Sequence, residues 1–460
     1  MLIASTAHAQ STAAAKSSTS TDPSYAAYSL YYYDANYVGH GMAGRIVDNG
    51  STVTPHPDMA GGTTSISLNG DPTVQGFDLS SSALRVAVTQ YDTTNTPANP
   101  QTVYIYNATT TSSTPLTTIS GGWSNVANLY GLVKVGSYLY AIDYDNARVV
   151  EINPSTYVQT GISYTLPSQT VSGTTYAAHG QALLNINGTL YGLFTFYYTD
   201  SSFVNHYINS ELVKFAITGG SSISVGDSNS NFAQNAYALT ANTNNSNIYV
   251  ASIGGYQYNG SYNTASAIQS INYGSPLSGV TPTTVMSPSS TYPYNFLDIS
   301  LNTNTSPATA YVLMGVYDSS YNISGVLLST TDFTNFTTID SFSGLSNSYY
   351  WAAQYTTENN RIWYARGNPI WVYDASSTST PVAQLTLSSG SLLSSGDPTY
   401  TNLSNFSFVD PPANKVLRGY RSPIQVSNTA WAAKARAITQ GRPSLTKEEV
   451  EQLNSESNKE

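Results

Sequence analysis

A phrase of four short strands recurs along this chain, and it is clearest between residues 131 and 162. There, Gly131–Pro154 holds three strands rich in Val, Leu, Ile and Tyr, and Val158–Ile162 supplies a fourth after a polar turn. A single four-stranded sheet cannot bury both of its faces, but copies stacked around an axis can. The phrase therefore predicts an all-β chain folded as a β-propeller, with almost no helix before residue 430.

Further copies of the phrase follow at a spacing of roughly 40 to 60 residues, which suits propeller blades. Each copy pairs a β-branched or aromatic strand with a turn of Asn, Gly, Asp or Pro. The copies begin at Leu84, Gly131, Ala182, Asn247, Ala310, Arg361 and Phe406. We therefore expect seven four-stranded blades; six or eight remain alternatives because the first and last copies are weak. Residues 28–33 and 45–47 are expected to complete the last blade and close the ring.

Both ends of the chain differ in composition from the propeller expected at 25–431. Residues 1–9 end in Ala-His-Ala, which is typical of the end of a secretory signal, and 10–24 form a Ser/Thr/Ala-rich linker. Residues 432–460 are a charged tail, in which Thr446 and Glu449 have the spacing of a capping box and indicate a short helix from about Leu445 to Leu453. The tail is expected to be a solvated segment, with a docking peptide as the alternative.

Composition narrows the class of protein. Only 9% of the residues are charged, far below the usual quarter, while 40% are hydrophobic, which is enough to bury a core. A surface of hydroxyls and amides suits an extracellular, cell-surface or periplasmic protein. The net charge of −10 without a basic cluster disfavours nucleic acid as a partner, and no apolar run approaches the length of a membrane span. The lack of cysteine excludes disulfides and thiolate chemistry.

Sequence motifs of catalysis are missing: there is no His-Glu-x-x-His, Gly-x-Ser-x-Gly or Walker loop. Aspartates recur after the second strand of several blades, where they usually hydrogen-bond their own turn. These are Asp92, Asp143, Asp145, Asp200 and Asp318. The alternative is that they gather at one end of the ring to bind Ca²⁺, but Asp143-Tyr-Asp145 is the nearest approach to a calcium loop. No cofactor and no metal site is expected.

The loops offer a stronger indication of function. Residues 196–207 and 256–262 form long loops rich in Tyr and Asn, and the connections between blades repeat this composition. In a propeller these two kinds of loop open on the same side. Their aromatic rings either pack between blades or form a binding face, on which rings supply contact area and Asn supplies hydrogen bonds. The predicted ligand-binding residues are Trp123, Tyr176, His179, Tyr198, Tyr258, Tyr294, Tyr350 and Trp351.

The segment 135–154 resembles a blade of the secreted bacterial propellers related to the YVTN and NHL repeats. The resemblance covers this blade well and the others loosely. It implies the propeller fold, but the superfamily includes surface-layer modules, binding proteins and some enzymes. The scarcity of charge is also similar to that of surface-layer and adhesin proteins.

Two functions follow as hypotheses. The first is an exported, non-enzymatic module that binds a glycan or a cell-surface protein, or assembles with itself. The second is an exported hydrolase or lyase acting on a polysaccharide or lactone, using His40, His179 or His206 with a carboxylate. Convergence of these histidines within hydrogen-bond reach would favour catalysis.

The alternation of apolar residues with polar neighbours also predicts four core residues: Leu139, Ile142, Val150 and Ile152.

Overall fold

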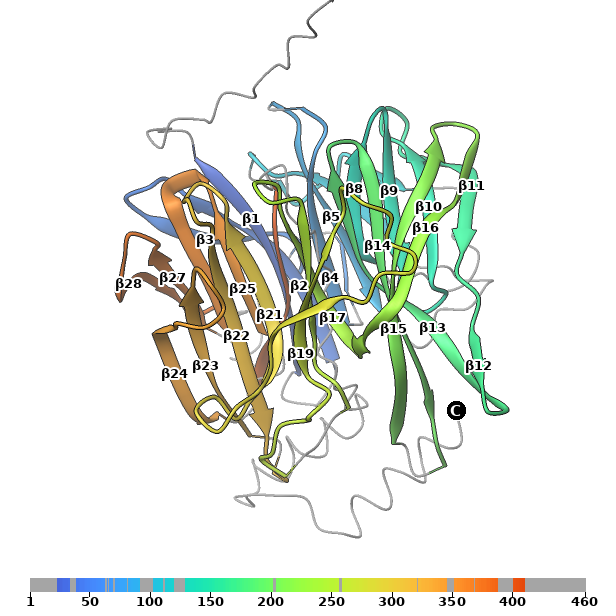
Figure 1. The fold of residues 1–460 in the computed structure, drawn as a ribbon. Coiled ribbons are helices and arrows are strands. Elements are labelled where there is room, and N and C mark those ends of the chain that lie inside the picture. The colour runs from blue at the N-terminus through green and yellow to red at the C-terminus, as the bar shows by residue number, and fades with distance from the viewer. Residues whose placement is uncertain are drawn as a thin grey trace, which may run out of the picture.

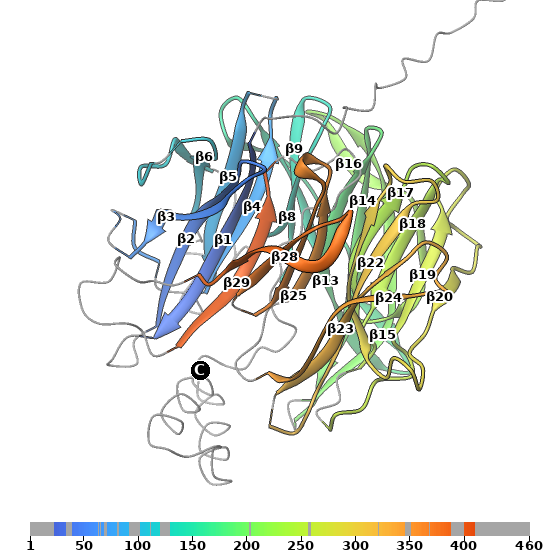
Figure 2. The same ribbon diagram turned by 90° about the vertical axis from the view of Figure 1, so that its left-hand side faces the viewer.

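The fold is a seven-bladed β-propeller built from antiparallel sheets (Figures 1 and 2). The computed structural model describes residues 23–33, 39–62, 64, 66–68, 71–80, 82–91, 102–110, 112–119, 129–201, 204–255, 259–320, 322–345, 351–367, 369–387 and 400–409. Within these ranges the only helix is the short 3₁₀ turn η1 (Glu358–Asn360). No helix in the described part of the chain is long and apolar enough to cross a membrane.

The first three blades follow one another along the chain, each written here from its innermost strand outward. Blade 1 consists of β4 (Asp71–Asp78), β5 (Leu84–Tyr91), β6 (Val103–Asn107) and β7 (Thr117–Ile119). Blade 2 consists of β8 (Leu129–Val135), β9 (Tyr138–Asp143), β10 (Arg148–Asn153) and β11 (Val158–Thr165). Blade 3 consists of β13 (Thr174–Ile186), β14 (Thr189–Thr199), β15 (Asn205–Thr218) and β16 (Ser222–Gln234), with the short β12 (Gln169–Val171) paired to the start of β13.

The remaining blades complete the ring. Blade 4 consists of β17 (Ala236–Asn242), β18 (Asn247–Ser252), β19 (Ala267–Asn272) and β20 (Thr283–Met286). Blade 5 consists of β21 (Asn295–Asn302), β22 (Thr309–Tyr317), β23 (Ile323–Thr330) and β24 (Thr337–Leu345). Blade 6 consists of β25 (Trp351–Thr356), β26 (Arg361–Arg366), β27 (Ile370–Asp374) and β28 (Ser377–Leu385). Blade 7 consists of β29 (Tyr400–Phe408), β1 (Ser24–Tyr33), β2 (Gly39–Asp48) and β3 (Val53–Gly61).

The predicted fold is confirmed, including the number of blades and the way in which the ring closes. Each copy of the four-strand phrase falls in a different blade, and the fifth strand of blade 3 is the one addition. The ring closes in blade 7, where β29 from the end of the described chain pairs with β1 from its beginning, Tyr28 opposite Phe406. The proposed signal, most of the linker and the charged tail lie outside the described residues, and so does the continuation of the last copy at 415–426.

Alternation along the strands places apolar side chains between neighbouring sheets. The four predicted core residues, Leu139, Ile142, Val150 and Ile152, are each at most 1% exposed. They belong to a cluster that spans blades 1, 2 and 3. Burying a large aliphatic side chain in this way stabilises the fold by roughly 1.5 to 3 kcal/mol.

Polar side chains add a second link between blades. The innermost strand of a blade is an edge of its sheet. The backbone N–H groups on its unpaired side therefore need hydrogen-bond acceptors from outside the sheet. Buried side chains of the preceding blade supply these partners at distances of 2.9 Å. The accepting groups are Ser210 for Ala236, Ser266 for Phe296, Asp298 for Ala353, Ser300 for Tyr355, and Ser407 for Gly76. These bonds fix the position of each inner strand relative to its neighbour.

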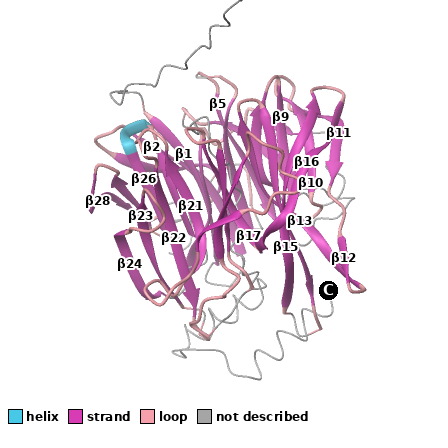
Figure 3. Cartoon of the chain, viewed as in Figure 1, coloured by secondary structure: helices cyan, strands magenta, loops and turns pink. Residues whose placement is uncertain are grey.

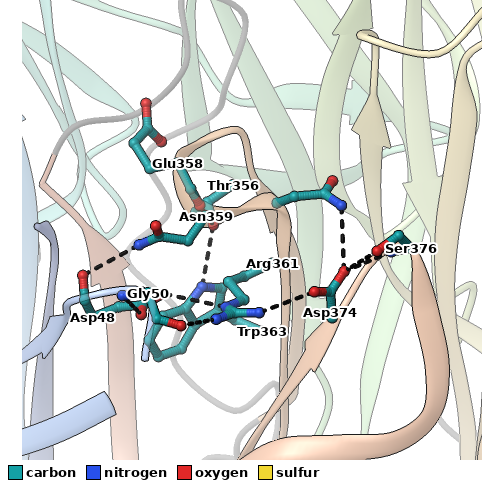
Figure 4. A network of polar contacts seen from close by, with 10 residues as sticks. Asp48, Gly50, Thr356, Glu358, Asn359, Arg361, Trp363, Asp374 and Ser376 are labelled. Atoms are coloured by element: carbon teal, nitrogen blue, oxygen red, sulfur yellow. Dashed lines mark hydrogen bonds and ion pairs between the residues drawn. The ribbon is translucent and has the colours of Figure 1, made fainter. Parts of the chain in front are cut away.

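A charged network joins blade 6 to blade 7 beside the closure (Figure 4). Arg361, which is 6% exposed, lies between two carboxylates: its Nε is 3.5 Å from Asp48 Oδ2 and its Nη1 is 3.4 Å from Asp374 Oδ2. It also donates through Nη2 to the carbonyl oxygen of Gly50 at 2.6 Å. Asp48 is fully buried, so this guanidinium is what compensates its charge across the blade boundary.

Candidate functional site

Among the residues that the structure describes, blade 3 carries an extension that the other blades lack. Its strands β13 to β16 run for 11 to 14 residues, and β14 and β15 remain paired to Thr199 opposite Asn205. The β12–β13 hairpin flanks the same end, with Thr170 opposite Thr175. This extension, residues 169–179 and 195–208, lies at the end of the molecule opposite η1 (Figure 3). Backbone pairing makes it a rigid support for side chains rather than the open loop that the sequence indicated.

One row of stacked rings crosses from blade 2 to blade 3. Tyr130 stacks on Tyr144 with ring centroids 4.4 Å apart, and Tyr144 meets His179 at 4.7 Å. His179 in turn stacks on Tyr197 at 4.2 Å, and Tyr197 contacts Tyr207 at 5.3 Å. The Tyr144 hydroxyl donates to the Tyr197 hydroxyl at 3.4 Å. The row anchors the extension to the neighbouring blade.

The environment of His179 keeps its ring neutral. Burial lowers the pKa of His179 from 6.5 to about 4, although a hydrogen bond with the Tyr144 backbone opposes this shift. The Nδ1 atom is buried and has no hydrogen-bond partner within the described part of the chain. Burial also raises the pKa of Tyr144 well above its ordinary value. Near neutral pH these two rings therefore act as uncharged packing groups and not as proton carriers.

A second cluster lies on the other face of the extension. Because Tyr197 and Tyr198 are consecutive in a strand, their side chains point to opposite faces. Tyr198 meets Tyr176 edge-on at 5.2 Å and stacks on His206 at 4.8 Å. His206 Nε2 lies 2.8 Å from Asp200 Oδ2, and the other oxygen of Asp200 accepts the backbone N–H of Val204 at 2.9 Å. The turn between β14 and β15 thus holds this cluster in place.

The second cluster is open to solvent. Tyr176 and Tyr198 are half-buried, and the side chain of His206 is 44% exposed. Two valines at the hairpin tips are also exposed, Val171 at 44% and Val204 at 50%. The end of the blade 3 extension therefore exposes aromatic, imidazole and aliphatic side chains to solvent.

The structure brings only part of the predicted binding face together. Tyr176, His179 and Tyr198 all lie on the extension of blade 3, where His179 joins the inter-blade row. Tyr294 is half-buried in the connection between blades 4 and 5, near Tyr292. Trp351 requires a correction, because it is fully buried and packs against Tyr317 at 5.2 Å. Three of the predicted residues lie outside the described residues: Trp123, Tyr258 and Tyr350.

The histidines considered for catalysis have separate surroundings. His40 stacks on Tyr32 in blade 7, with ring centroids 5.4 Å apart. His179 and His206 are both in blade 3, but they belong to the two different ring clusters. Within the described ranges, no group of three or more His, Cys, Asp or Glu residues is arranged to hold a metal ion.

The turn function expected of the aspartates is confirmed at two of these positions. Asp200 accepts the N–H of Val204, and Asp318 accepts the N–H groups of Ser320 and Asn322 at 2.8 and 2.9 Å. Such side-chain-to-backbone bonds are the usual task of Asp in a turn.

Sequence reasoning missed most of the inter-blade row, which is formed by Tyr130, Tyr144, Tyr197 and Tyr207. The signal for Tyr197 and Tyr207 was present, because both lie in the Tyr-rich segment 196–207. Tyr144 lies in the Asp143-Tyr-Asp145 turn, and this pattern indicated a role only for the two aspartates. Their contacts depend on how two blades meet, which a single blade phrase does not contain.

Comparison with known proteins agrees with the fold. No protein-family model matches the sequence, and no curated protein matches it. Among solved structures, a protein from Lactobacillus plantarum is similar over 85% of this chain and 100% of its own, with 10% identity and a TM-score of 0.51. A putative 6-phosphogluconolactonase from Bacteroides fragilis is similar over 85% of this chain and 99% of its own, with 12% identity and a TM-score of 0.48. At such identities the likeness concerns the fold alone, and at that level the resemblance to β-propeller proteins is confirmed.

Proposed function

We propose that this chain is an exported, non-enzymatic binding module that contacts its ligand through the extension of blade 3. The observation that carries the proposal is the second cluster, Tyr176, Tyr198 and His206, on an extension that also exposes Val171 and Val204. Rigid aromatic rings lose little conformational entropy on binding, which is why they dominate binding surfaces. The paired strands below them hold the rings in one arrangement.

Of the two ligand classes expected from the sequence, the cluster favours a protein at the cell surface. Val171 and Val204 are aliphatic, and covering both with the apolar surface of a partner would remove their side chains from water, which is favourable. A sugar would use the faces of Tyr176 and Tyr198 but would gain little from the valines. A second copy of this chain is a protein partner of the same chemistry.

The test measures binding and self-association of the full chain and of the Tyr198→Ala variant. The probes are an array of neutral and acidic oligosaccharides, the envelope proteins of the producing organism, and the chain itself in analytical ultracentrifugation. An aromatic anchor contributes about 2 kcal/mol or more, so Tyr198→Ala should weaken binding about 30-fold. The matched control is Tyr292→Ala, which removes another half-buried tyrosine that contacts Phe336.

Equal loss in both variants would place the ligand elsewhere and contradict the proposal. Binding to oligosaccharides alone would replace the protein partner by a glycan at the same cluster. The enzymatic alternative is tested on lactones and polysaccharides. Turnover that is abolished by His206→Ala but not by Tyr292→Ala would show that the cluster catalyses a reaction.

A further inference from the structure

Several turns of the ring contain Asn-x-Ser/Thr, the acceptor tripeptide for N-linked glycans when x is not proline. A set of them lies in the first and third connections of the blades. Their asparagines are Asn49, Asn107, Asn187, Asn244, Asn304 and Asn335. Two lie in second connections, Asn259 and Asn322, and two lie within β29, Asn402 and Asn405.

The first and third connections share one end of the molecule, because antiparallel strands alternate in direction. Contacts between blades agree with this placement. Asn244 donates through Nδ2 to the carbonyl oxygen of Thr303 at 2.9 Å, which joins the first connections of blades 4 and 5. Asn359 of η1 donates to the carbonyl oxygen of Asp48 at 3.2 Å, which joins a first connection to a third (Figure 4). This is the end opposite the extension of blade 3 (Figure 3).

Two of the asparagines at this end have an amide group that is fully available. Asn49 and Asn187 are exposed, and neither side chain makes a hydrogen bond within the described part of the chain. Asn187 is at the tip of a two-residue turn with φ of 50°, and the space around the following Gly188 is open. By contrast, the amide nitrogens of Asn244 and Asn335 donate to Thr303 and Asp332.

The difference matters because of the chemistry of the modification. The amide nitrogen forms a bond to the anomeric carbon of a lipid-diphosphate sugar donor, the anomeric C–O bond breaks, and the lipid diphosphate and one amide proton leave. The nitrogen keeps a single hydrogen and gains a bulky substituent. An asparagine whose amide nitrogen already donates a hydrogen bond would lose that hydrogen bond on modification. An exposed asparagine without such a bond loses no interaction.

We propose that Asn49 and Asn187 carry N-linked glycans. The proposal rests on the export proposed above, since the donor and the transferase act on exported chains. Glycans at these two sites would solubilise a surface that has few charges, with 9% charged residues in the whole chain. They would also cover the end of the ring away from Tyr176 and Tyr198, so that the binding cluster stays open.

The chain contains its own negative control. Asn153-Pro154-Ser155 lies in the third connection of blade 2, at the same end, and the Ser155 N–H donates to Asn153 Oδ1 at 2.9 Å. It has the asparagine and the serine of an acceptor, but proline at the middle position blocks transfer. Asn153 should therefore be unmodified.

The experiment is peptide mapping by mass spectrometry on the protein taken from the envelope or extracellular fraction of the producing organism. We expect sugar on the peptides that contain Asn49 and Asn187 and none on the peptide with Asn153. Thr189→Ala should abolish the glycan at Asn187, and Pro154→Ala should create one at Asn153. Unmodified Asn49 and Asn187 in protein that is exported would overturn the proposal and leave the binding function intact. Absence of the protein from that fraction would overturn export, and the glycan proposal with it.

Discussion

Replacing Arg361 by methionine should loosen the contact between blades 6 and 7, beside the ring closure. Arg361 is 6% exposed, and it compensates the fully buried Asp48 of blade 7 from its place in blade 6. Methionine retains the length of the side chain and removes the charge. Within the described ranges, the carboxylate of Asp48 would then keep only the N–H of Gly50, which donates to its Oδ1 at 2.8 Å.

The expected cost follows from leaving one buried charge without its partner, which is about 3 to 5 kcal/mol. The entropy of unfolding is roughly 2.1 cal/mol/K per residue. For 460 residues this amounts to about 1 kcal/mol/K, so the melting temperature should fall by about 3 to 5 °C. Part of the effect should vanish when Asp48→Asn is already present, because paired groups couple by about 0.5 to 3 kcal/mol.

Denaturation by urea gives the free energies for both single variants and the double variant, and amide hydrogen exchange locates the opening. In the Arg361→Met variant, the rate of amide hydrogen exchange should increase more in β1 and β2 than in the strands of the other blades. Arg148→Met is the matched control, since its partner Asp143 at 3.4 Å lies in the same hairpin of blade 2. A loss below about 1 kcal/mol, or strictly additive single effects, would refute the role of this ion pair in holding blade 6 against blade 7.

Two further predictions concern the core and the response to pH. Truncating Ile142 or Leu139 to alanine should cost roughly 2 to 5 kcal/mol in urea denaturation, and losses below about 0.5 kcal/mol would mean that the strand register is wrong. His179 has a folded pKa of about 4 against 6.5 when unfolded, so the unfolded chain binds the proton first as the pH falls. Stability should therefore decline between pH 6.5 and about 4, by on the order of 3 kcal/mol, and His179→Phe should remove that part of the decline; an unchanged profile in the variant would exclude His179 as its source.

The sequence was sufficient to predict the fold because a blade phrase is local. In 131–162 the alternation and the turns define one sheet, and the need to bury its faces implies the ring. The extra strand β12 was not predictable in this way, since Gln169–Val171 has only three residues and pairs with the start of the long strand β13. The closing strand β29 was identified through Phe406 and Phe408; Phe406 stacks on Trp363 of blade 6, and Phe408 meets the same ring edge-on.

The candidate site was only partly predictable, because its contacts depend on the way blades meet. The Tyr-rich segment 196–207 pointed to the correct blade, but an aromatic ring in a connection can point inward or outward. Trp351 begins an inner strand and is buried, whereas Tyr198 is carried beyond the ring on paired strands. Local sequence does not distinguish these two outcomes, since both residues are large and flat and both directly follow a tyrosine.

The closure in blade 7 also sets the order of events during synthesis. Strands β1 to β3 emerge first, but the strand that completes their sheet, β29, is among the last to be made. At roughly 5 to 20 residues per second, the gap of some 370 residues between β1 and β29 corresponds to about 20 to 70 seconds of translation. During this time the first strands have no inner neighbour, so the complete ring forms only after most of the chain has left the ribosome. Such a delay would favour the proposed export, because translocation could begin before a closed ring exists.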